Sequence, residues 1–340
     1  MIACMVRRRP AIFFSLFVCT LALVVVPSVS EGASIITTPA VSQAVNKATT
    51  QKALGVISPT LAQLGGGDSN FIGPYTYASC NPFDPSLSAP ARAALLAKPR
   101  PCWFGSMSAT KVIVLVGDSH AGMWTPAFRA LASSYGFKIA NFVYSACPPV
   151  ITNLDAPPKI YSGQLSNSKD CQTWNKNLGP QINTLKPAAV FFGNGREFSI
   201  APADVFAKWN AGFVALIKTI KIPRKFLIGS TPFVVTPPQR WQCAASHATA
   251  VDECAIKFNP SDSADVSAAQ LRSDQIIATQ SGAELLDVSN MFCGKDNPKL
   301  WSCPAVIGGK IVYVHGAHVT SDYMTFIAPA FRPVFSRIFP

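Results

Sequence analysis

Five consecutive aliphatic residues, Val112–Val116, end at Gly117 and are followed within a few residues by a helical pattern. An unbroken apolar run of this length is typical of a strand covered on both faces, as in the middle of a parallel sheet. Between Met123 and Tyr135 apolar or aromatic residues recur at helical intervals, and Gly136 stands where a helix commonly ends. The segment therefore predicts a strand, a tight turn and a helix in succession.

The same alternation continues to the end of the chain. Repeated strand–helix units predict an α/β fold, a three-layer α/β/α sandwich with a parallel central sheet. Ligands of such sheets bind at the carboxyl ends of the strands, so the chemistry is expected there. The expected strands are Lys138–Tyr144, Ala188–Phe192, Lys225–Gly229, Glu284–Asp287 and Lys310–Val314, and the expected helices are Ala89–Ala97, Cys171–Ile182, Ala203–Ile220, Ser267–Gln280 and Thr320–Ile338.

The start of the chain has the three-part pattern of a secretory signal. Arg7–Arg9 precede the apolar run Ala11–Val26, and small residues follow, so we expect a signal peptide over residues 1–30 with cleavage after about Ser30. An uncleaved N-terminal anchor is the alternative. Residues 31–74 are rich in Thr, Ala, Ser, Gln and Gly and predict a flexible arm or linker with one helix over Val41–Leu54, and residues 75–340 form the expected folded domain.

Composition narrows the possible partners. Hydrophobic residues make up 49% of the chain and charged residues 14%, which argues against disorder. The formal charge is +12, and loss of Arg7–Arg9 with the signal would leave +9. That excess suits anionic polymers or lipid head groups. Because the chain has neither a dense Lys/Arg block nor an aromatic-basic stripe, we expect a basic soluble surface and no nucleic-acid partner.

Eight cysteines remain after the predicted signal, an even number that suggests disulfides in an exported protein. Eight cysteines permit 105 pairings, but these fall into four couples that are close in sequence. No C-x2-C spacing or Cys/His cluster of the zinc type occurs, so no metal is expected. The expected disulfides are Cys80–Cys102, Cys147–Cys171, Cys243–Cys254 and Cys293–Cys303.

Gly117-Asp118-Ser119-His120 follows the first predicted strand. The turn leaves Ser119 at a helix start, where free N–H groups favour a developing negative charge. A serine nucleophile needs a base within hydrogen-bond reach. Of the four histidines, His120 should point away from the hydroxyl and serve as support, and His247 lies inside a disulfide loop. His315 and His318 share a segment near the end of the chain, and His318 lies in a loop that can overhang the same sheet edge. We therefore pair Ser119 with His318, against the alternative of an ordinary capped turn.

Three separated blocks resemble one family. The stretch Val112–Leu131 is similar to the first block of the SGNH branch of the GDSL hydrolase superfamily. Tyr144–Pro149 with Asp170–Asn175, and Cys293–His318, resemble a narrower group, the SGNH domains that accompany integral membrane O-acyltransferases of bacterial envelopes. The resemblance covers roughly residues 75 to 340 in the family's order.

The resemblance implies roles for individual residues. Ser119 resembles the nucleophile and His318 the general base. The oxyanion hole would consist of the backbone N–H of Ser119, a backbone N–H near Ser145 or Ala146, and the side-chain amide of Asn194. Asp118 and His120 are expected as supporting residues. Gly-Asn-Gly around Asn194 is also an ordinary turn sequence.

One position departs from the family. The acid expected three residues before the base is His315 in this chain, and an imidazole offers no permanent negative charge to orient a second one. Three outcomes are open: a Ser–His dyad oriented by a backbone carbonyl, an acid such as Asp322 supplied from the helix start, or an impaired site. A zinc site formed by His315 and His318 is disfavoured because further ligands are missing.

These observations predict an exported serine acyl-transfer enzyme, periplasmic, cell-surface or secreted. It would act on O-acyl, above all O-acetyl, groups of cell-envelope glycans as an O-acetyltransferase or acetylesterase through an acyl-serine. The family's fused members carry a membrane acyltransferase that this chain lacks, so transfer would need a separate membrane acyl-donor protein. The alternative is a non-catalytic glycan-binding or scaffold module with a degenerate site. No cofactor is expected.

Overall fold

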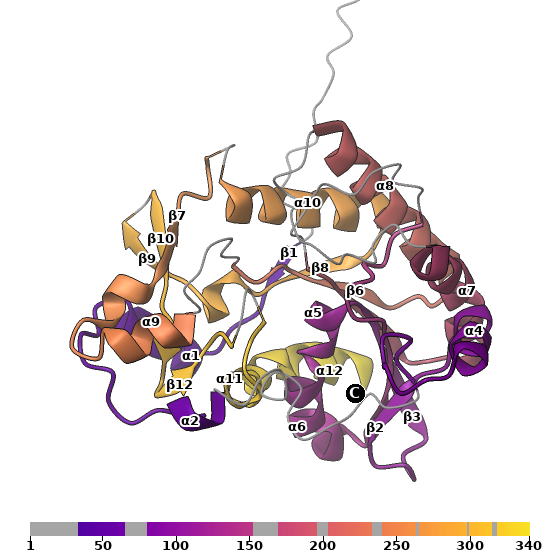
Figure 1. Cartoon of the computed structure of the whole chain (residues 1–340), viewed down its shortest axis with the longest axis horizontal. Helices are drawn as coiled ribbons and strands as arrows, with labels where there is room; N and C mark the ends of the chain where they lie inside the picture. Colours follow the sequence, from indigo (N-terminus) through magenta and orange to yellow (C-terminus); the bar gives the residue numbers. More distant parts are fainter. Residues whose placement is uncertain are drawn as a thin grey trace, which may run out of the picture. The chain divides into compact units, whose positions relative to one another are not determined.

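A seven-stranded sheet forms the centre of the protein, in the order β1-β8-β6-β5-β3-β4-β2 (Figure 1). The structure is a computed structural model that describes residues 33–64, 80–151, 169–195, 203–232, 240–262, 265–297, 299–314 and 318–340. The strands of the sheet are β1 (Ala33–Ile35), β2 (Cys102–Gly105), β3 (Lys111–Gly117), β4 (Phe137–Val143), β5 (Ala189–Gly193), β6 (Lys225–Ile228) and β8 (Glu284–Asp287).

Six of the seven strands run parallel. β3 pairs in parallel with β4 on one side and β5 on the other, and the ladder continues through β6 and β8 to β1. Only β2, at one edge, is antiparallel to its neighbour β4. The predicted α/β fold with a parallel central sheet is therefore confirmed. The carboxyl ends of β3, β5, β6 and β8 lie along the same side of the sheet, across the direction of the strands.

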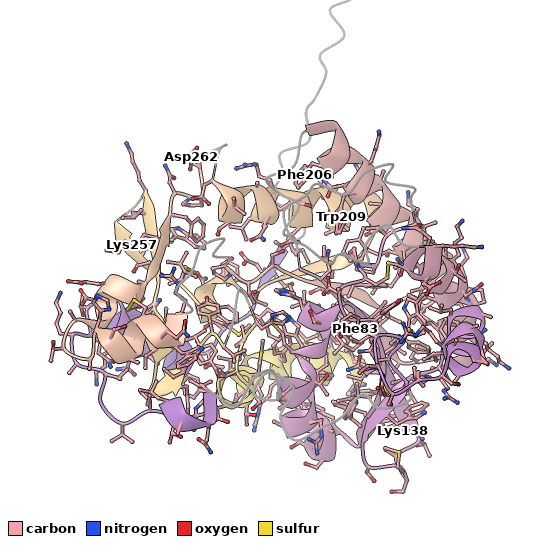
Figure 2. The ribbon with its side chains drawn as sticks, in the orientation of Figure 1. Phe83, Lys138, Phe206, Trp209, Lys257 and Asp262 are labelled. Carbon is pink, nitrogen blue, oxygen red and sulfur yellow. A yellow bond between two sulfur atoms is a disulfide. The ribbon has the colours of Figure 1, made fainter. Side chains whose placement is uncertain are left out.

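Helices cover both faces of this sheet (Figure 1). β3 shows why its sequence is apolar throughout, since Ile113 and Leu115 belong to one buried cluster and Val114 and Val116 to the other. Trp209, labelled in Figure 2, is buried in the second cluster. The first cluster is covered by α6 (Thr125–Tyr135), α11 (Ser321–Ile327) and α12 (Arg332–Ile338), and the second by α4 (Ala89–Ala97), α7 (Lys169–Leu185), α8 (Ala203–Thr219) and α10 (Val266–Ser281).

The described part of the expected N-terminal arm is packed into the domain. β1 extends the sheet by pairing with β8, and α1 (Pro39–Ala48) buries Val41 and Val45 in the first cluster. The prediction of a flexible arm is thus wrong for residues 33–64, because these short elements bury apolar side chains in spite of their polar composition. The predicted signal over residues 1–30 and residues 65–74 lie outside the described residues.

Two smaller sheets and a broken final helix were not anticipated. β10 (Leu300–Cys303) pairs antiparallel with β7 (Ile256–Phe258) and β9 (Gly294–Asn297), and β11 (Val306–Ile307) pairs with β12 (Lys310–Ile311), the short remnant of the strand expected over Lys310–Val314. The helix expected over Thr320–Ile338 is interrupted by a 3₁₀ turn, Ala328–Phe331, because Pro329 in this turn and Pro333 in α12 lack an N–H for continuous α-helical bonding.

The four disulfides in the structure are the four couples expected from proximity: Cys80–Cys102, Cys147–Cys171, Cys243–Cys254 and Cys293–Cys303. Within the described ranges, none of the helices combines the length and apolar character needed to cross a bilayer.

Candidate active site

The two central strands β3 and β5 end in glycines that touch. Gly117 has φ of 149°, and a Cβ on it would overlap the carbonyl oxygen of Gly193. Only glycine tolerates both this backbone conformation and this approach. The close contact brings the turn that follows β3, with Ser119, beside the turn that follows β5, with Asn194.

Asp118 holds these two turns together. It is the N-cap of the short helix α5 (Ser119–Gly122), and its carboxylate accepts a hydrogen bond from the His120 N–H at 2.9 Å. The same carboxylate accepts the Gly195 N–H, at 3.1 Å to Oδ1 and 3.0 Å to Oδ2. Asp118 is buried, so these bonds are shielded from water. The structure thus places Asp118 between the turn that carries Ser119 and the turn that carries Asn194.

Ser119 and His318 meet although they are 199 residues apart. The His318 Nε2 lies 2.7 Å from the Ser119 Oγ, within hydrogen-bond range. The loop that carries His318 is fixed at its base, since the Val314 N–H donates to the His318 carbonyl at 2.9 Å and Tyr313 forms an antiparallel bridge with Val319. Both side chains are only partly buried, so an ester could reach them.

His120 lies beside the base. Its ring centroid is 4.4 Å from that of His318, with 35° between the ring planes. On its other side the buried His120 ring faces Gly195, where an added Cβ would come within 2.6 Å of the His120 Cδ2. The expectation that His120 points away from the Ser119 hydroxyl is compatible with this placement, and His120 packs the His318 ring in place.

The loop that follows β4 carries the second pair of oxyanion candidates, Ser145 and Ala146. The Tyr144 N–H donates to the Gly117 carbonyl at 3.0 Å, which joins this loop to the turn of Ser119. Ala146 has φ of 58°, a left-handed conformation that residues with a Cβ seldom adopt. Such strain is concentrated at functional sites. Through the bond between Tyr144 and Gly117, the strained Ser145–Ala146 loop lies at the same end of the sheet as Ser119.

Asn194, the third oxyanion candidate, is buried directly after β5. In this conformation its side-chain Nδ2 donates to the Gly195 carbonyl at 3.2 Å. Because Asp118 holds the Gly195 N–H from below, the backbone of this turn is fixed relative to Ser119. Asn194 thus lies on the turn adjacent to the nucleophile candidate.

Tyr144 anchors the loop that follows β4 in the apolar core. Its ring is buried and meets Trp174 of α7 edge-on, with 5.9 Å between centroids. Burial first, and then the negative charge of Asp170, raise the pKa of the Tyr144 phenol, while the positive charge of Arg92 lowers it. The net direction is upward, so the phenol stays neutral at physiological pH.

Asp322 is one of the candidates for the acid that orients the His318 ring. The Asp322 carboxylate accepts a hydrogen bond from the Ser58 hydroxyl. Within the described part of the chain Asp322 bonds to Ser58 and not to His318, so in this conformation it is not the orienting acid. His315 lies outside the described residues.

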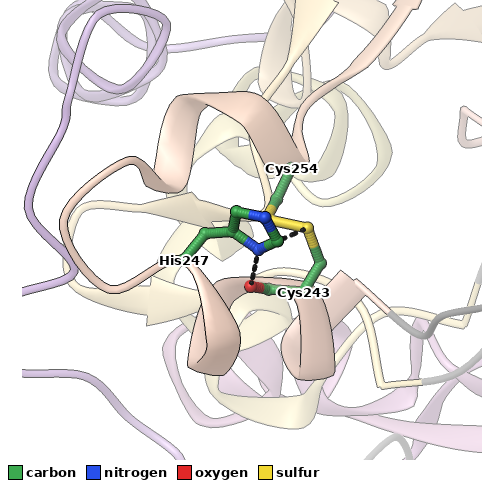
Figure 3. A group of neighbouring side chains, drawn as sticks. All are labelled: Cys243, His247 and Cys254. Carbon is green, nitrogen blue, oxygen red and sulfur yellow. Dashed lines mark hydrogen bonds between the residues drawn. A yellow bond between two sulfur atoms is a disulfide. The ribbon is translucent and has the colours of Figure 1, made fainter.

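A second group of side chains has metal-ligand types. Cys243, His247 and Cys254 place their ligand atoms within 4.8 Å of one another, and Figure 3 shows the imidazole over the sulfurs. The two sulfurs are joined in a disulfide, and the His247 Nδ1 lies 3.0 Å from the Cys243 carbonyl oxygen. Thiolates, not disulfides, bind metals, so in the oxidised protein this group is a disulfide covered by a histidine.

Asn81 is a residue that the sequence did not single out. It bonds to Ser145 through its side chain. Its sole signal in the sequence was its position directly after Cys80.

An α/β/α sandwich with a serine–histidine pair at the end of its central strand is the architecture of an SGNH-class domain. Residues 80–333 match the model of the family described as "SGNH domain (fused to AT3 domains)", and the chain belongs to this family. Among solved structures it is similar to the periplasmic domain of a lipopolysaccharide acetyltransferase of Salmonella ser. Paratyphi A. That likeness has a TM-score of 0.51 and 13% identity, covers 84% of this chain and 99% of the other, and concerns the fold. A search of curated proteins found no match.

Proposed function

We propose that this protein is an exported serine acyl-transfer enzyme that acts on O-acyl, above all O-acetyl, groups of cell-envelope glycans. The observation that carries the proposal is the 2.7 Å contact between the His318 Nε2 and the Ser119 Oγ at the carboxyl end of the central strand. Membership of the SGNH family and the acetyltransferase named for the similar structure support an acyl-transfer or ester-hydrolysis role.

The chemistry proceeds in two halves. His318 Nε2 takes the proton of Ser119 Oγ, and the oxygen attacks the acyl carbonyl carbon. The ester C–O bond breaks, the leaving alcohol takes the proton from His318, and the acyl group remains on Ser119. Water or a sugar hydroxyl then attacks the acyl-serine while His318 accepts its proton, and Ser119 recovers its hydrogen. Water gives esterase activity, and a sugar hydroxyl gives transfer.

The tetrahedral intermediate of each half needs hydrogen-bond donors for its oxyanion. We assign these to the backbone N–H of Ser119, a backbone N–H of the Ser145–Ala146 loop and the side-chain amide of Asn194. The left-handed backbone at Ala146 and the fixing of the Asn194 turn by Asp118 support this assignment. Preorganised donors of this kind supply a large part of the rate enhancement in acyl transfer.

In this proposal Ser119 and His318 operate as a dyad, and a backbone carbonyl orients the His318 ring. The bond of Asp322 to Ser58 argues against an acid from the helix start. The ring of His120, 4.4 Å away, contributes packing that restricts the orientation of His318.

An exported location is part of the proposal. Four disulfides are typical of oxidising compartments, and the similar solved structure is a periplasmic domain. The association of the family with membrane acyltransferase domains suggests two partners, an acylated envelope glycan and, for the transfer reaction, a separate membrane acyl-donor protein.

The test is release of acetate from para-nitrophenyl acetate and from acetylated oligosaccharides, with and without added acceptor sugar. We expect turnover by the wild type and none by Ser119→Ala. A matched control is Ser106→Ala, since Ser106 is an exposed serine that bonds to Ser108. Activity of Ser119→Ala equal to that of the wild type would show that the site is elsewhere.

The second candidate function is a non-catalytic glycan-binding or scaffold module in the same cell envelope. The observation that favours it is His315 at the position where the family has an acid. This candidate predicts that acetylated oligosaccharides bind with equal affinity to the wild type and to Ser119→Ala, while neither releases acetate.

A further inference from the structure

Asn81 uses both ends of its side-chain amide to hold one residue of the candidate oxyanion loop. Its Nδ2 donates to the Ser145 Oγ at 3.0 Å, and its Oδ1 accepts the Ser145 N–H at 3.3 Å. The same Oδ1 accepts the Phe83 N–H at 3.1 Å, which closes the turn that Asn81 begins. Asn81 is 5% exposed, so water competes little for these bonds.

The loop that Asn81 contacts requires support. Ala146 adopts a left-handed backbone conformation that is unfavourable for a residue with a Cβ. Such a conformation persists only where the surroundings enforce it. The Tyr144 N–H bond to Gly117 holds one end of the loop, and the Cys147–Cys171 disulfide holds the other. Asn81 holds Ser145, between these two anchors.

Asn81 is itself fixed relative to that loop. Its neighbour Cys80 is joined by a disulfide to Cys102 of β2. In the sheet Cys102 pairs with Asn141 of β4, and β4 leads directly into the loop. The disulfide, the strand pair and the Asn81–Ser145 bonds therefore form a closed circuit. Phe83, labelled in Figure 2, is 50% exposed, so this turn lies at the protein surface.

We propose that Asn81 is a positioning residue for acyl transfer. Because it occupies the Ser145 N–H, it would act through Ser145 on the other backbone donor of the Ser145–Ala146 loop, the Ala146 N–H. This inference rests on the proposed function of the Ser119 site. Both ends of the Asn81 amide are engaged by protein atoms, so it would affect the stabilisation of the intermediate more than the binding of the substrate.

The test is steady-state hydrolysis of para-nitrophenyl acetate by Asn81→Ala. We expect kcat to fall about 10- to 100-fold, less than for loss of an oxyanion donor itself, with KM within about twofold of wild type. Asn81→Asp keeps an oxygen for the two N–H groups, and the Ser145 hydroxyl can rotate to donate to the other oxygen. This conservative variant is therefore expected to retain most of the wild-type kcat.

Asn183 provides a matched control. Its Nδ2 donates to the Thr219 carbonyl at 3.0 Å and its Oδ1 accepts the Lys221 N–H at 2.8 Å, so it also bridges backbone segments with both ends of its amide. It lies near the end of α7, which precedes β5, at the sheet edge opposite to Ser119. Asn183→Ala is expected to lower the unfolding temperature without changing kcat.

A second readout separates positioning from stability. A serine-directed phosphonate forms a tetrahedral adduct that uses the same oxyanion donors, so its inactivation rate should fall in parallel with kcat in Asn81→Ala. A kcat and an inactivation rate equal to those of wild type would overturn the proposal, as would equal losses in Asn81→Ala and Asn183→Ala. If Asn81→Ala does not fold, Ser145→Ala decides: it removes the Oγ partner of Asn81, and unchanged kcat there would overturn the proposal.

The two levels of the proposal fail differently. A wild-type protein without turnover, whose Ser119 the phosphonate leaves unlabelled, would refute the proposed function. An active wild type whose Ser119→Ala variant is dead but whose Asn81→Ala variant is unimpaired would refute the role of Asn81 alone.

Discussion

His318 and His247 show how differently the same side chain behaves in two regions of this protein. His318 reaches across 199 residues to place Nε2 at 2.7 Å from a serine hydroxyl at the end of the central strand. His247 directs Nδ1 to a carbonyl only four residues earlier in its own helical turn, 3.0 Å away, over a closed disulfide. The first has a partner that can be activated, and the second has partners that cannot react as nucleophiles.

The difference lies in the scaffold around each ring. His318 is positioned by a strand bridge, a bond to Val314 and the ring of His120, all at the edge where the parallel strands end. His247 belongs to a small peripheral group closed by its own disulfide. Contacts between residues far apart in the sequence thus build the site of Ser119 and His318. Contacts within one short segment build the group of Cys243, His247 and Cys254, here called the staple.

The largest expected effect on kcat/KM comes from replacing His318 and His247 by alanine in two separate variants. His318→Ala removes the only base that contacts Ser119 among the described residues, and kcat/KM for para-nitrophenyl acetate should fall about ten-thousand-fold. His247→Ala should leave kcat/KM within about twofold of wild type. A loss of similar size in both variants would break the distinction between the two regions.

Asn194→Ala tests whether the turn after β5 belongs to the reactive region. Loss of one oxyanion donor should lower kcat by about 100- to 1000-fold with little change in KM. Asn177→Ala is the matched control, since its Nδ2 donates to the Leu96 carbonyl away from the strand ends. If both asparagine variants hydrolyse the ester at the wild-type rate, Asn194 is only a turn residue.

The staple is tested by replacing its disulfide. A double Cys243→Ser, Cys254→Ser variant should lose about 2–3 kcal/mol of unfolding free energy, because the broken cross-link closes a loop with a sequence separation of 11. Urea unfolding measures this loss, and kcat at a temperature where the variant is folded should equal that of wild type. A variant that is folded but inactive would mean that the two regions are coupled.

The smallest expected effect is an electrostatic effect on stability. It concerns Glu284, at the amino end of β8, away from the strand ends that carry the site. Glu284 accepts two hydrogen bonds from Arg337, at 2.7 and 3.1 Å, and one from Ser34 at 2.7 Å. Burial raises the pKa of this carboxyl, but the bonds from Arg337 and Ser34 and the charge of Arg337 lower it more, so the net direction is downward.

A lowered pKa in the folded protein stabilises the fold above the ordinary glutamate pKa, and the gain is lost as pH falls through the lowered value. Glu284→Gln should therefore cost less than about 1 kcal/mol near pH 7, since the pair is partly exposed, and a smaller amount near pH 3. Urea unfolding of both proteins at the two pH values measures the difference. A cost that grows toward acid pH would contradict the assignment.

The central fold could be predicted because its strands are apolar on both faces. Alternate side chains of Val112–Val116 pack into two buried clusters on opposite faces of the sheet. Because both faces are buried, the sequence of this strand is continuously hydrophobic. β1 and β9 could not be predicted in the same way, because Ala-Ser-Ile is too short for its pattern to be distinctive and Gly-Lys-Asp-Asn has no apolar side chain. Their formation depends on partners supplied by the folded domain.

The site divides along the same line. The meeting of Ser119 with His318 could be anticipated only in part: Ser119 follows the central strand β3, but the strand expected before His318 is reduced to β12, which pairs with β11 outside the parallel sheet. The Cys80–Cys102 disulfide beside Asn81 was expected, but the contacts of Asn81 with Ser145 could not be predicted, since they also depend on the antiparallel pairing of β2 with β4, which has no local sequence pattern. The replacement of the family's acid by His315 was visible in the sequence, whereas the engagement of Asp322 by Ser58 required the structure.

The most direct test of the account is to look for the covalent intermediate. The wild type is mixed rapidly with an acetyl ester and quenched in acid, and the intact protein and its peptides are weighed by mass spectrometry. We expect one acetyl group on Ser119, formed faster than it is lost, and no acetylated peptide from Ser119→Ala. Steady turnover with the acetyl group on another residue, or with Ser119 never modified, would contradict the account.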